Sequence, residues 1–233
     1  MTLSKRQKQI SEKVDINKAY SLNDAIDAIK NLPKLKFNES VDISINLGID
    51  PKNSEQNVRG ASSLPHGIGK EVKVVVFADG DDASAAKKAG ADKVGFEDLI
   101  ETIKKDKDLD ADIVIATPDC MKLLGQLGRI LGPKNLMPNP KEGTVTKNID
   151  KAVKDAKKGQ IRYKIDKAGI IHTTVGKVDF DSKKLLENID TLIKDLNKAK
   201  PASAKGKYMK NITLSSTMGP GIKVDLSTVE RSS

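Results

Sequence analysis

The sequence predicts an α+β outer domain, an antiparallel sheet with helices, which is split by an inserted α/β domain with a parallel, Rossmann-like sheet. Three observations predict this fold class. Residues 40–47 alternate strictly between polar and apolar side chains, which indicates a strand with one buried face. Residues 72–78 and 113–116 are apolar almost throughout and have helical segments between them, as in a parallel sheet covered on both faces. Past Gly159 the amphipathic strand pattern returns.

The first 66 residues predict two helices and one strand. Residues 5–20 are polar with weak helical periodicity, which is typical of a surface helix. Ser21 and Asp24 resemble a capping box, and apolar residues then recur at helical spacing up to Pro33. Two helices and the strand at residues 40–47 cannot make a sheet domain alone. We therefore expect them to combine with the end of the chain.

Strands and helices alternate through residues 67–159, the predicted inserted domain. In chain order they are a strand at 72–78, a helix at 82–89, a strand at 93–94, a helix at 97–105, a strand at 113–116, a helix at 119–131 and a helix at 149–157. Chain crossings near Gly67 and Gly159 would join the insert to the outer domain, residues 1–66 plus 160–233. Glycine-flanked connections of this kind would allow the two domains to open and close relative to each other.

Residues 160–233 predict a second set of amphipathic elements. Strands at 161–165 and 170–175 are separated by Asp166-Lys167-Ala168-Gly169, which predicts a hairpin. A helix then begins at Asp181 or Ser182, with a stripe of leucine and isoleucine along one face. Two further strands, at 212–215 and 222–226, flank a tight segment with three glycine or proline residues.

Composition favours a polyanionic partner without requiring one. The net charge is +9, and most of the basic excess falls in residues 160–233. Basic patches neutralise phosphates, yet a lysine-rich solubilising surface explains the same numbers equally well. A single Cys rules out a disulfide framework, and one Cys with two His argues against a zinc site of Cys and His ligands. The charged N-terminal residues contain no apolar signal segment, and no apolar run could span a bilayer.

The inserted domain invites an enzyme interpretation, which its motifs do not support. Gly67-Ile68-Gly69-Lys70 lacks the Ser or Thr of a phosphate loop and precedes a strand rather than following one. Asp79-Gly80-Asp81-Asp82 lies where a dinucleotide fingerprint belongs, but its three acids would repel a pyrophosphate. These acids suit a helix-capping turn better than a magnesium site. A structural role also suits Cys120 better than a nucleophilic one. We expect no catalytic site, cofactor or metal.

Three motifs carry a resemblance to a known family: Ser63–Lys70, Gly125–Gly143 and Ser216–Val224. In this order they resemble the L-one family of bacterial large-subunit ribosomal proteins, over nearly the whole chain. The resemblance implies a cytoplasmic, ribosome-associated protein, which we expect to be a monomer when free. It also implies binding to rRNA of the mobile side stalk, help in releasing exit-site tRNA, and repression of its own operon mRNA.

The resemblance also implies which residues touch RNA. In that family the split outer domain makes most contacts, and the matching positions are Lys36, Phe37, Ser40, Ser215, Thr217, Met218 and Gly219. From strand alternation and charge we add Lys164, Lys167 and His172. The family's insert contributes a weaker surface, which we place on Arg129, Lys134 and Asn135. A lone Phe is usually a core residue, so Phe37 could pack inside instead of against nucleotides.

Two other functions remain as alternatives. One is a nucleotide-dependent enzyme built on the insert, and the other is a non-specific DNA binder. The predicted strands ISINLGI and IIHTTV carry no aromatic residues, so the stacking used by RNA-recognition-motif sheets is unavailable. Recognition would then depend on shape, riboses, phosphates and backbone contacts in a folded RNA.

Overall fold

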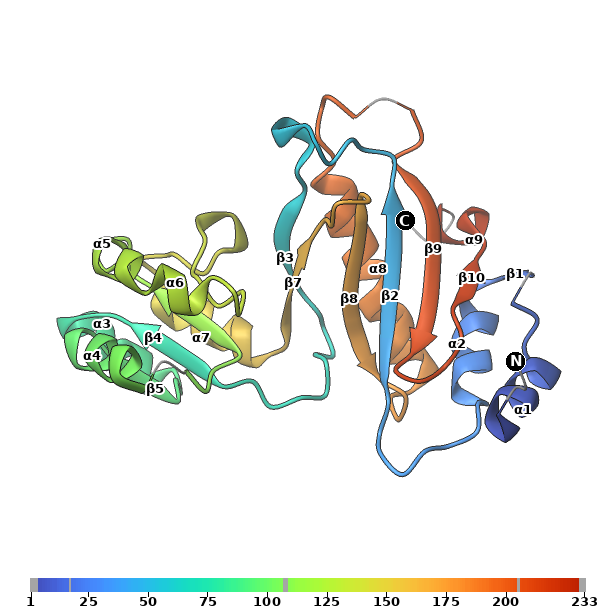
Figure 1. The fold of residues 1–233 in the computed structure, drawn as a ribbon, viewed down its shortest axis with the longest axis horizontal. Coiled ribbons are helices and arrows are strands. Elements are labelled where there is room, and N and C mark those ends of the chain that lie inside the picture. Colours follow the sequence, from blue (N-terminus) through green and yellow to red (C-terminus); the bar gives the residue numbers. More distant parts are fainter. Residues whose placement is uncertain (1–3, 17, 107–108, 205, 231–233) are drawn as a thin grey trace. The chain divides into compact units, whose positions relative to one another are not determined.

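The computed structural model describes residues 4–16, 18–106, 109–204 and 206–230. The chain divides into two compact units (Figure 1). Unit 1 comprises Met1–Gly69 and Ile161–Ser233, and unit 2 is Lys70–Gln160. The predicted fold class is confirmed, with a mostly antiparallel sheet and helices in unit 1 and a three-stranded parallel sheet in unit 2. No helix within the described ranges is long and apolar enough to cross a membrane.

Unit 1 is built around a five-stranded sheet. Its elements are α1 (Lys5–Lys13), β1 (Ala19–Tyr20), α2 (Leu22–Lys30), β2 (Ser40–Leu47), a 3-10 turn (Ser54–Gln56), β3 (Arg59–Ser63), β7 (Gln160–Lys164), β8 (Ile170–Lys177), α8 (Ser182–Lys198), β9 (Met209–Ser216), β10 (Ile222–Val224) and α9 (Leu226–Glu230). The strand order is β1-β10-β9-β2-β8. Strand β2 pairs antiparallel with both β8 and β9, whereas the short β1 pairs parallel with β10.

The predicted alternation of β2 is confirmed, and it creates the core of unit 1. Val41, Ile43, Ile45 and Leu47 are at most 2% exposed, and the residues between them remain partly open to solvent. Helices α2 and α8 pack against this apolar face, and Figure 1 shows α8 behind the sheet. Full burial of one such side chain stabilises the fold by about 1.5–3 kcal/mol. The opposite, polar face of β2 is thereby left for other contacts.

The hairpin predicted between residues 161–165 and 170–175 forms at its turn, where the Asp166 N–H donates to the Ile170 carbonyl at 2.9 Å, but the two strands do not continue as a paired ladder. Strand β7 pairs with β3 in a separate two-stranded sheet, and only an isolated bridge between Ile165 and Ile171 links it to β8. Strand β3 was not predicted, since its small residues carry little strand propensity. Its partner explains its composition, because a Cβ on Gly60 would lie 2.7 Å from the hydroxyl of Tyr163. A side chain at position 60 would therefore displace the Tyr163 ring.

Two smaller differences concern the C-terminal elements of unit 1. The last strand ends at Val224 rather than at residue 226, and α9 begins at Leu226. Asp225 ends the strand because its carboxylate accepts a hydrogen bond from the backbone N–H of Ser227, and its carbonyl accepts one from the Thr228 hydroxyl. An Asp side chain that bonds the backbone two residues on is a turn signal.

Unit 2 is a parallel sheet with helices on both faces. Its elements are β4 (Val74–Phe77), α3 (Gly80–Lys88), β5 (Lys93–Gly95), α4 (Glu97–Asp106), β6 (Ile113–Ala116), α5 (Met121–Leu124), a 3-10 turn (Gly125–Leu127), α6 (Gly128–Leu131), a 3-10 turn (Pro140–Glu142) and α7 (Ile149–Lys157). The strand order is β5-β4-β6. Val75 and Phe77 face one buried cluster, and Val74 and Val76 face another, so both faces of β4 are covered.

The helix predicted over residues 119–131 begins at Met121 and is interrupted by a 3-10 turn. Two short helices, α5 and α6, are separated by the 3-10 turn at Gly125–Leu127. Glycine lowers helix stability by up to about 1 kcal/mol relative to alanine, and Gly125 and Gly128 bracket this turn. The apolar periodicity nevertheless keeps Leu124 and Leu127 buried.

Candidate nucleic-acid interface

The start of β2 and the end of β9 meet at one end of the sheet in unit 1. The backbone N–H of Ser40 donates to the Thr217 hydroxyl at 3.0 Å, and the N–H of Thr217 donates to the Ser40 carbonyl at 3.1 Å. The Lys177 ammonium donates to the Ser40 hydroxyl at 2.9 Å. These bonds unite two segments, 36–40 and 215–219, that were predicted separately.

Two large apolar side chains are exposed beside this junction. The exposed fraction is 53% for Phe37 and 60% for Met218. Phe37 is therefore not a core residue. It lines a hollow of about 210 Å³ together with Lys34, Leu35, Asn38, Glu39, Val178 and Asp179. Both side chains are thus available to pack against a ligand.

Gly219 shapes the turn that follows β9. Its N–H donates to the Ser216 carbonyl at 3.1 Å. A Cβ at this position would lie 2.4 Å from the Ser216 hydroxyl and 2.9 Å from the Cδ1 atom of Leu32. Any larger residue would displace its neighbours, so glycine is needed for the close approach of this turn to the core.

Sequence reasoning missed the buried carboxylate beneath this turn. Glu39 is 7% exposed, and its Oε1 atom accepts hydrogen bonds from the Met218 N–H at 2.9 Å and the Ser216 hydroxyl at 3.1 Å. Its Oε2 atom lies 3.5 Å from the Arg6 guanidinium. No local pattern points to these two residues, since their partners are far away along the chain.

The polar face of the sheet places His172 and Ser215 on either side of β2. Ser215 is paired with Asp42, and His172 with Ser44. The His172 Nδ1 atom lies 3.0 Å from the Ser44 hydroxyl. Both predicted residues therefore belong to one continuous polar surface with Ser40. Along β2, His172 lies opposite Ser44, two residues further from Ser40 than Asp42, the partner of Ser215.

Asp166 holds the turn next to His172. Its carboxylate accepts hydrogen bonds from the backbone N–H groups of Ile170 and Ala168, both at 2.8 Å, and it lies 3.6 Å from His172 Nε2. The bond from Ile170, then the bond from Ala168 and the nearby imidazole, hold the pKa of Asp166 below its usual value. The carboxylate thus contributes negative charge at this end of the surface.

Lys164 and Lys167 do not join the Ser40 end of the sheet. Both are exposed, and Lys167 lies in the turn whose Gly169 carbonyl accepts from the N–H of Leu47. Leu47 is the opposite end of β2, which at about 3.3 Å per residue is roughly 23 Å from Ser40. These lysines could contact only a ligand that runs along the whole face.

Arg129, Lys134 and Asn135 lie in unit 2, at and after the end of α6. All three are exposed. Asn135 has a positive φ of 54°, a conformation that asparagine tolerates better than most residues. Its N–H donates to the Gly132 carbonyl at 3.0 Å, which closes a turn that displays Lys134 and Asn135.

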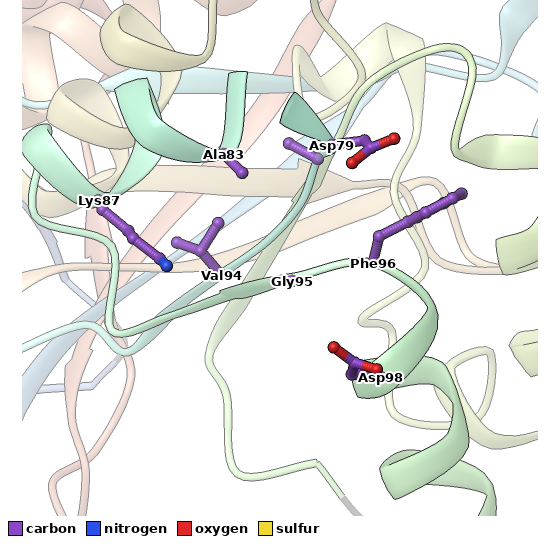
Figure 2. A pocket seen from close by; sticks show the side chains of 8 residues that line it. Asp79, Ala83, Lys87, Val94, Gly95, Phe96 and Asp98 are labelled. Carbon is purple, nitrogen blue, oxygen red and sulfur yellow. The ribbon is translucent and has the colours of Figure 1, made fainter. Parts of the chain in front are cut away.

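A hollow of about 500 Å³ in unit 2 lies at the carboxyl ends of β4 and β5. Figure 2 shows Asp79 at the N-terminus of α3, Asp98 in the first turn of α4, and Lys87 among the lining residues. Asp79 caps its helix by accepting from the Gly80 N–H at 2.8 Å. Two carboxylates against one ammonium do not suit the phosphates of a nucleotide.

The described residues offer no group of three or more metal-ligating acids, histidines or cysteines. Cys120 is buried, and burial raises the pKa of its thiol, although the Thr117 hydroxyl acts in the opposite sense. A protonated thiol is a poor nucleophile, which agrees with the structural role expected from the sequence.

Comparison with known proteins decides the family. Residues 28–220 match the Ribosomal protein L1p/L10e family. The chain belongs to this family. It is 58% identical over 225 residues to the large ribosomal subunit protein uL1 of Francisella philomiragia, covering 97% of each chain. It is 57% identical over 228 residues to the uL1 protein of Aliivibrio salmonicida, covering 98% of this chain and 97% of that one.

Membership confirms the resemblance drawn from the three sequence motifs. Ribosomal proteins of this family are structural proteins, and this L1-family chain is accordingly not an enzyme. The family match spans the junction of β2 with β9, including Lys36, Phe37, Ser40 and Thr217.

Proposed function

We propose that this chain is a structural constituent of the large ribosomal subunit and binds the rRNA of its mobile side stalk through unit 1. Two relatives that match it over nearly their full lengths are large-subunit proteins. The observation that carries the proposal is the exposure of Phe37 and Met218 on two distant segments joined by the Ser40–Thr217 hydrogen bonds.

The chemistry of this junction suits a sugar–phosphate surface. Lys36 supplies an exposed charge four residues before Ser40, and the Thr217 hydroxyl lies 3.0 Å from the Ser40 backbone nitrogen. Apolar side chains that remain in water can pack against riboses or unstacked bases. The small turn at Gly219 lets the protein backbone approach an RNA backbone closely.

The proposal includes two finer roles. The same surface would bind the chain's own operon mRNA, and the bound stalk would assist release of exit-site tRNA. Repression requires only that one surface has two competing RNA ligands, with rRNA binding more tightly. The exposed residues of unit 2, Arg129, Lys134 and Asn135, would add a weaker contact.

Matched substitutions of exposed apolar residues test the RNA surface. Met218→Asp places a negative charge at the proposed surface without entering the core, and Ile16→Asp does the same at a 49% exposed residue elsewhere in unit 1. We expect Met218→Asp to weaken a stalk rRNA fragment and an operon mRNA fragment in parallel, by at least about tenfold, or 1.4 kcal/mol. Ile16→Asp should leave both affinities nearly unchanged.

The binding assay distinguishes the alternatives. Filter binding at two salt concentrations should favour structured RNA over duplex DNA at both, whereas non-specific binding should collapse at the higher salt. Equal binding of DNA and RNA would favour the non-specific binder. Loss of one RNA affinity with the other intact would show two separate sites and contradict the repression mechanism.

A further inference from the structure

A network of buried and partly buried charges lies under the turn that carries Met218. Glu39 accepts from the Met218 N–H at 2.9 Å, and the Arg6 guanidinium donates to the Met218 carbonyl at 3.0 Å. Arg6 also lies 3.5 Å from Glu39 and donates to the Pro33 carbonyl at 3.5 Å. Both backbone groups of Met218 are thus held by side chains from outside its own strand.

Helix α1 delivers Arg6 to this network. Ser4 caps the helix, its hydroxyl accepting from the N–H of Gln7 while the Gln7 side chain accepts from the N–H of Ser4. The helix packs through Ile10, which belongs to the core of unit 1. Arg6 therefore starts from an anchored helix, and its side chain is only 23% exposed.

An exposed methionine needs such support. A turn with few apolar contacts samples many conformations. If only a fraction of the free molecules has the conformation that binds, the observed affinity is the intrinsic affinity multiplied by that fraction. The Met218 side chain is 60% exposed, so core packing does not hold it. Charge-assisted hydrogen bonds to its backbone are the alternative, and they are about twice as strong as neutral ones.

We propose that Arg6 and Glu39 are positioning residues that order the Met218 turn for RNA before RNA arrives. Glu39 holds the amide and Arg6 holds the carbonyl, so the pair fixes the peptide planes on both sides of Met218. This inference rests on the proposed rRNA-binding function, because it assigns the turn its ligand. It makes α1 part of the binding apparatus although α1 carries none of the predicted RNA contacts.

Two variants and a matched control test the inference in the full-length chain. Arg6→Ala removes the clamp on the Met218 carbonyl, and Glu39→Gln keeps an acceptor for the Met218 N–H but removes the ion pair. Lys8→Ala removes one positive charge from an exposed residue of the same helix. The measurements are amide hydrogen exchange at Met218 and Ile43 in the free protein, thermal unfolding, and affinity for a stalk rRNA fragment at several salt concentrations.

We expect exchange at Met218 to rise at least about fivefold in Arg6→Ala and Glu39→Gln, with no change at Ile43 in the core of β2. Affinity should fall by about tenfold, with an unchanged dependence on salt. Lys8→Ala should leave exchange unchanged. Unfolding temperatures within a few degrees of the wild type would show that the loss is local.

Other outcomes overturn the inference. If Arg6 contacts a phosphate directly, Arg6→Ala lowers the salt slope by about one unit, Arg6→Lys restores affinity, and exchange at Met218 stays unchanged. Unchanged exchange in both variants rejects the positioning role whatever the RNA affinity. Failure of the wild-type chain to bind the fragment rejects the proposed function instead, while the exchange data still decide whether Arg6 and Glu39 order the turn.

Discussion

Replacing Asn188 by Ala removes a side chain that connects three backbone groups inside unit 1. The Asn188 side-chain amide donates to the carbonyls of Gly67 at 3.0 Å and Val175 at 2.8 Å, and its oxygen accepts from the N–H of His66 at 3.2 Å. Asn188 is fully buried on α8. It thus connects His66 and Gly67, near the end of the first segment of unit 1, to β8.

The magnitude follows from the groups left without a partner. The register between β2 and β8 shifts so that Gly176 and Thr174 pair with successive residues of β2, and Val175 is the extra residue of this bulge. Its carbonyl and that of Gly67 are on buried residues, and each orphaned buried group costs about 1–3 kcal/mol. His66 is exposed, so its N–H can bind water. For these two groups together, we expect Asn188→Ala to lower the free energy of unfolding by about 2–6 kcal/mol.

Urea unfolding followed by tyrosine fluorescence measures this loss in unit 1 alone. The chain has no Trp, and its three Tyr residues, Tyr20, Tyr163 and Tyr208, all lie in unit 1. The control is Asn197→Ala, at an exposed asparagine of the same helix, which should change stability by less than about 0.5 kcal/mol. A loss below about 1 kcal/mol for Asn188→Ala, or equal losses in both variants, would refute the reasoning.

Three further predictions concern backbone and burial. Gly48→Ala should destabilise unit 1 by about 1–3 kcal/mol, measured by urea unfolding, because the new Cβ would lie 2.2 Å from the backbone oxygen of Lys207. An unchanged free energy of unfolding would mean that this backbone moves freely. Gly125→Ala meets nothing within 4 Å in a helical conformation, so it should stabilise unit 2 by up to about 1 kcal/mol, measured by circular dichroism, and a destabilisation would contradict this. Burial raises the pKa of Tyr208 to about 12, so its contribution to stability is complete below about pH 10 and is lost as the pH rises toward 12. Tyr208→Phe should reduce that alkaline loss, as judged from urea midpoints at pH 9 and 11, and an unchanged loss would assign it to other groups.

Elements with a strong internal pattern were predicted with their bounds. The predicted ranges of β2, β6 and α7 agree with the structure at both ends. Period-two alternation, an apolar run between turns and a helical stripe are properties of consecutive residues, so they are readable without a partner.

Pairing could not be read in the same way. Strand β7 has the alternation of a strand, but nothing in its residues shows that it pairs with β3 rather than with β8. In the paired strands Gly60 of β3 lies close to Tyr163 of β7, a contact between residues more than one hundred positions apart. Loop length and turn signals favoured the nearer partner, and long-range packing chose the other.

Residue patterns along the chain were enough to predict the two kinds of sheet, the family, and the segments around Phe37 and Met218 as candidates for RNA binding. Tertiary structure alone decided that these segments meet, and that Glu39 and Arg6 lie beneath them. The physical reason is that periodicity is a local property of the chain, whereas the burial of a carboxylate depends on donors contributed by α1 and by the turn after β9.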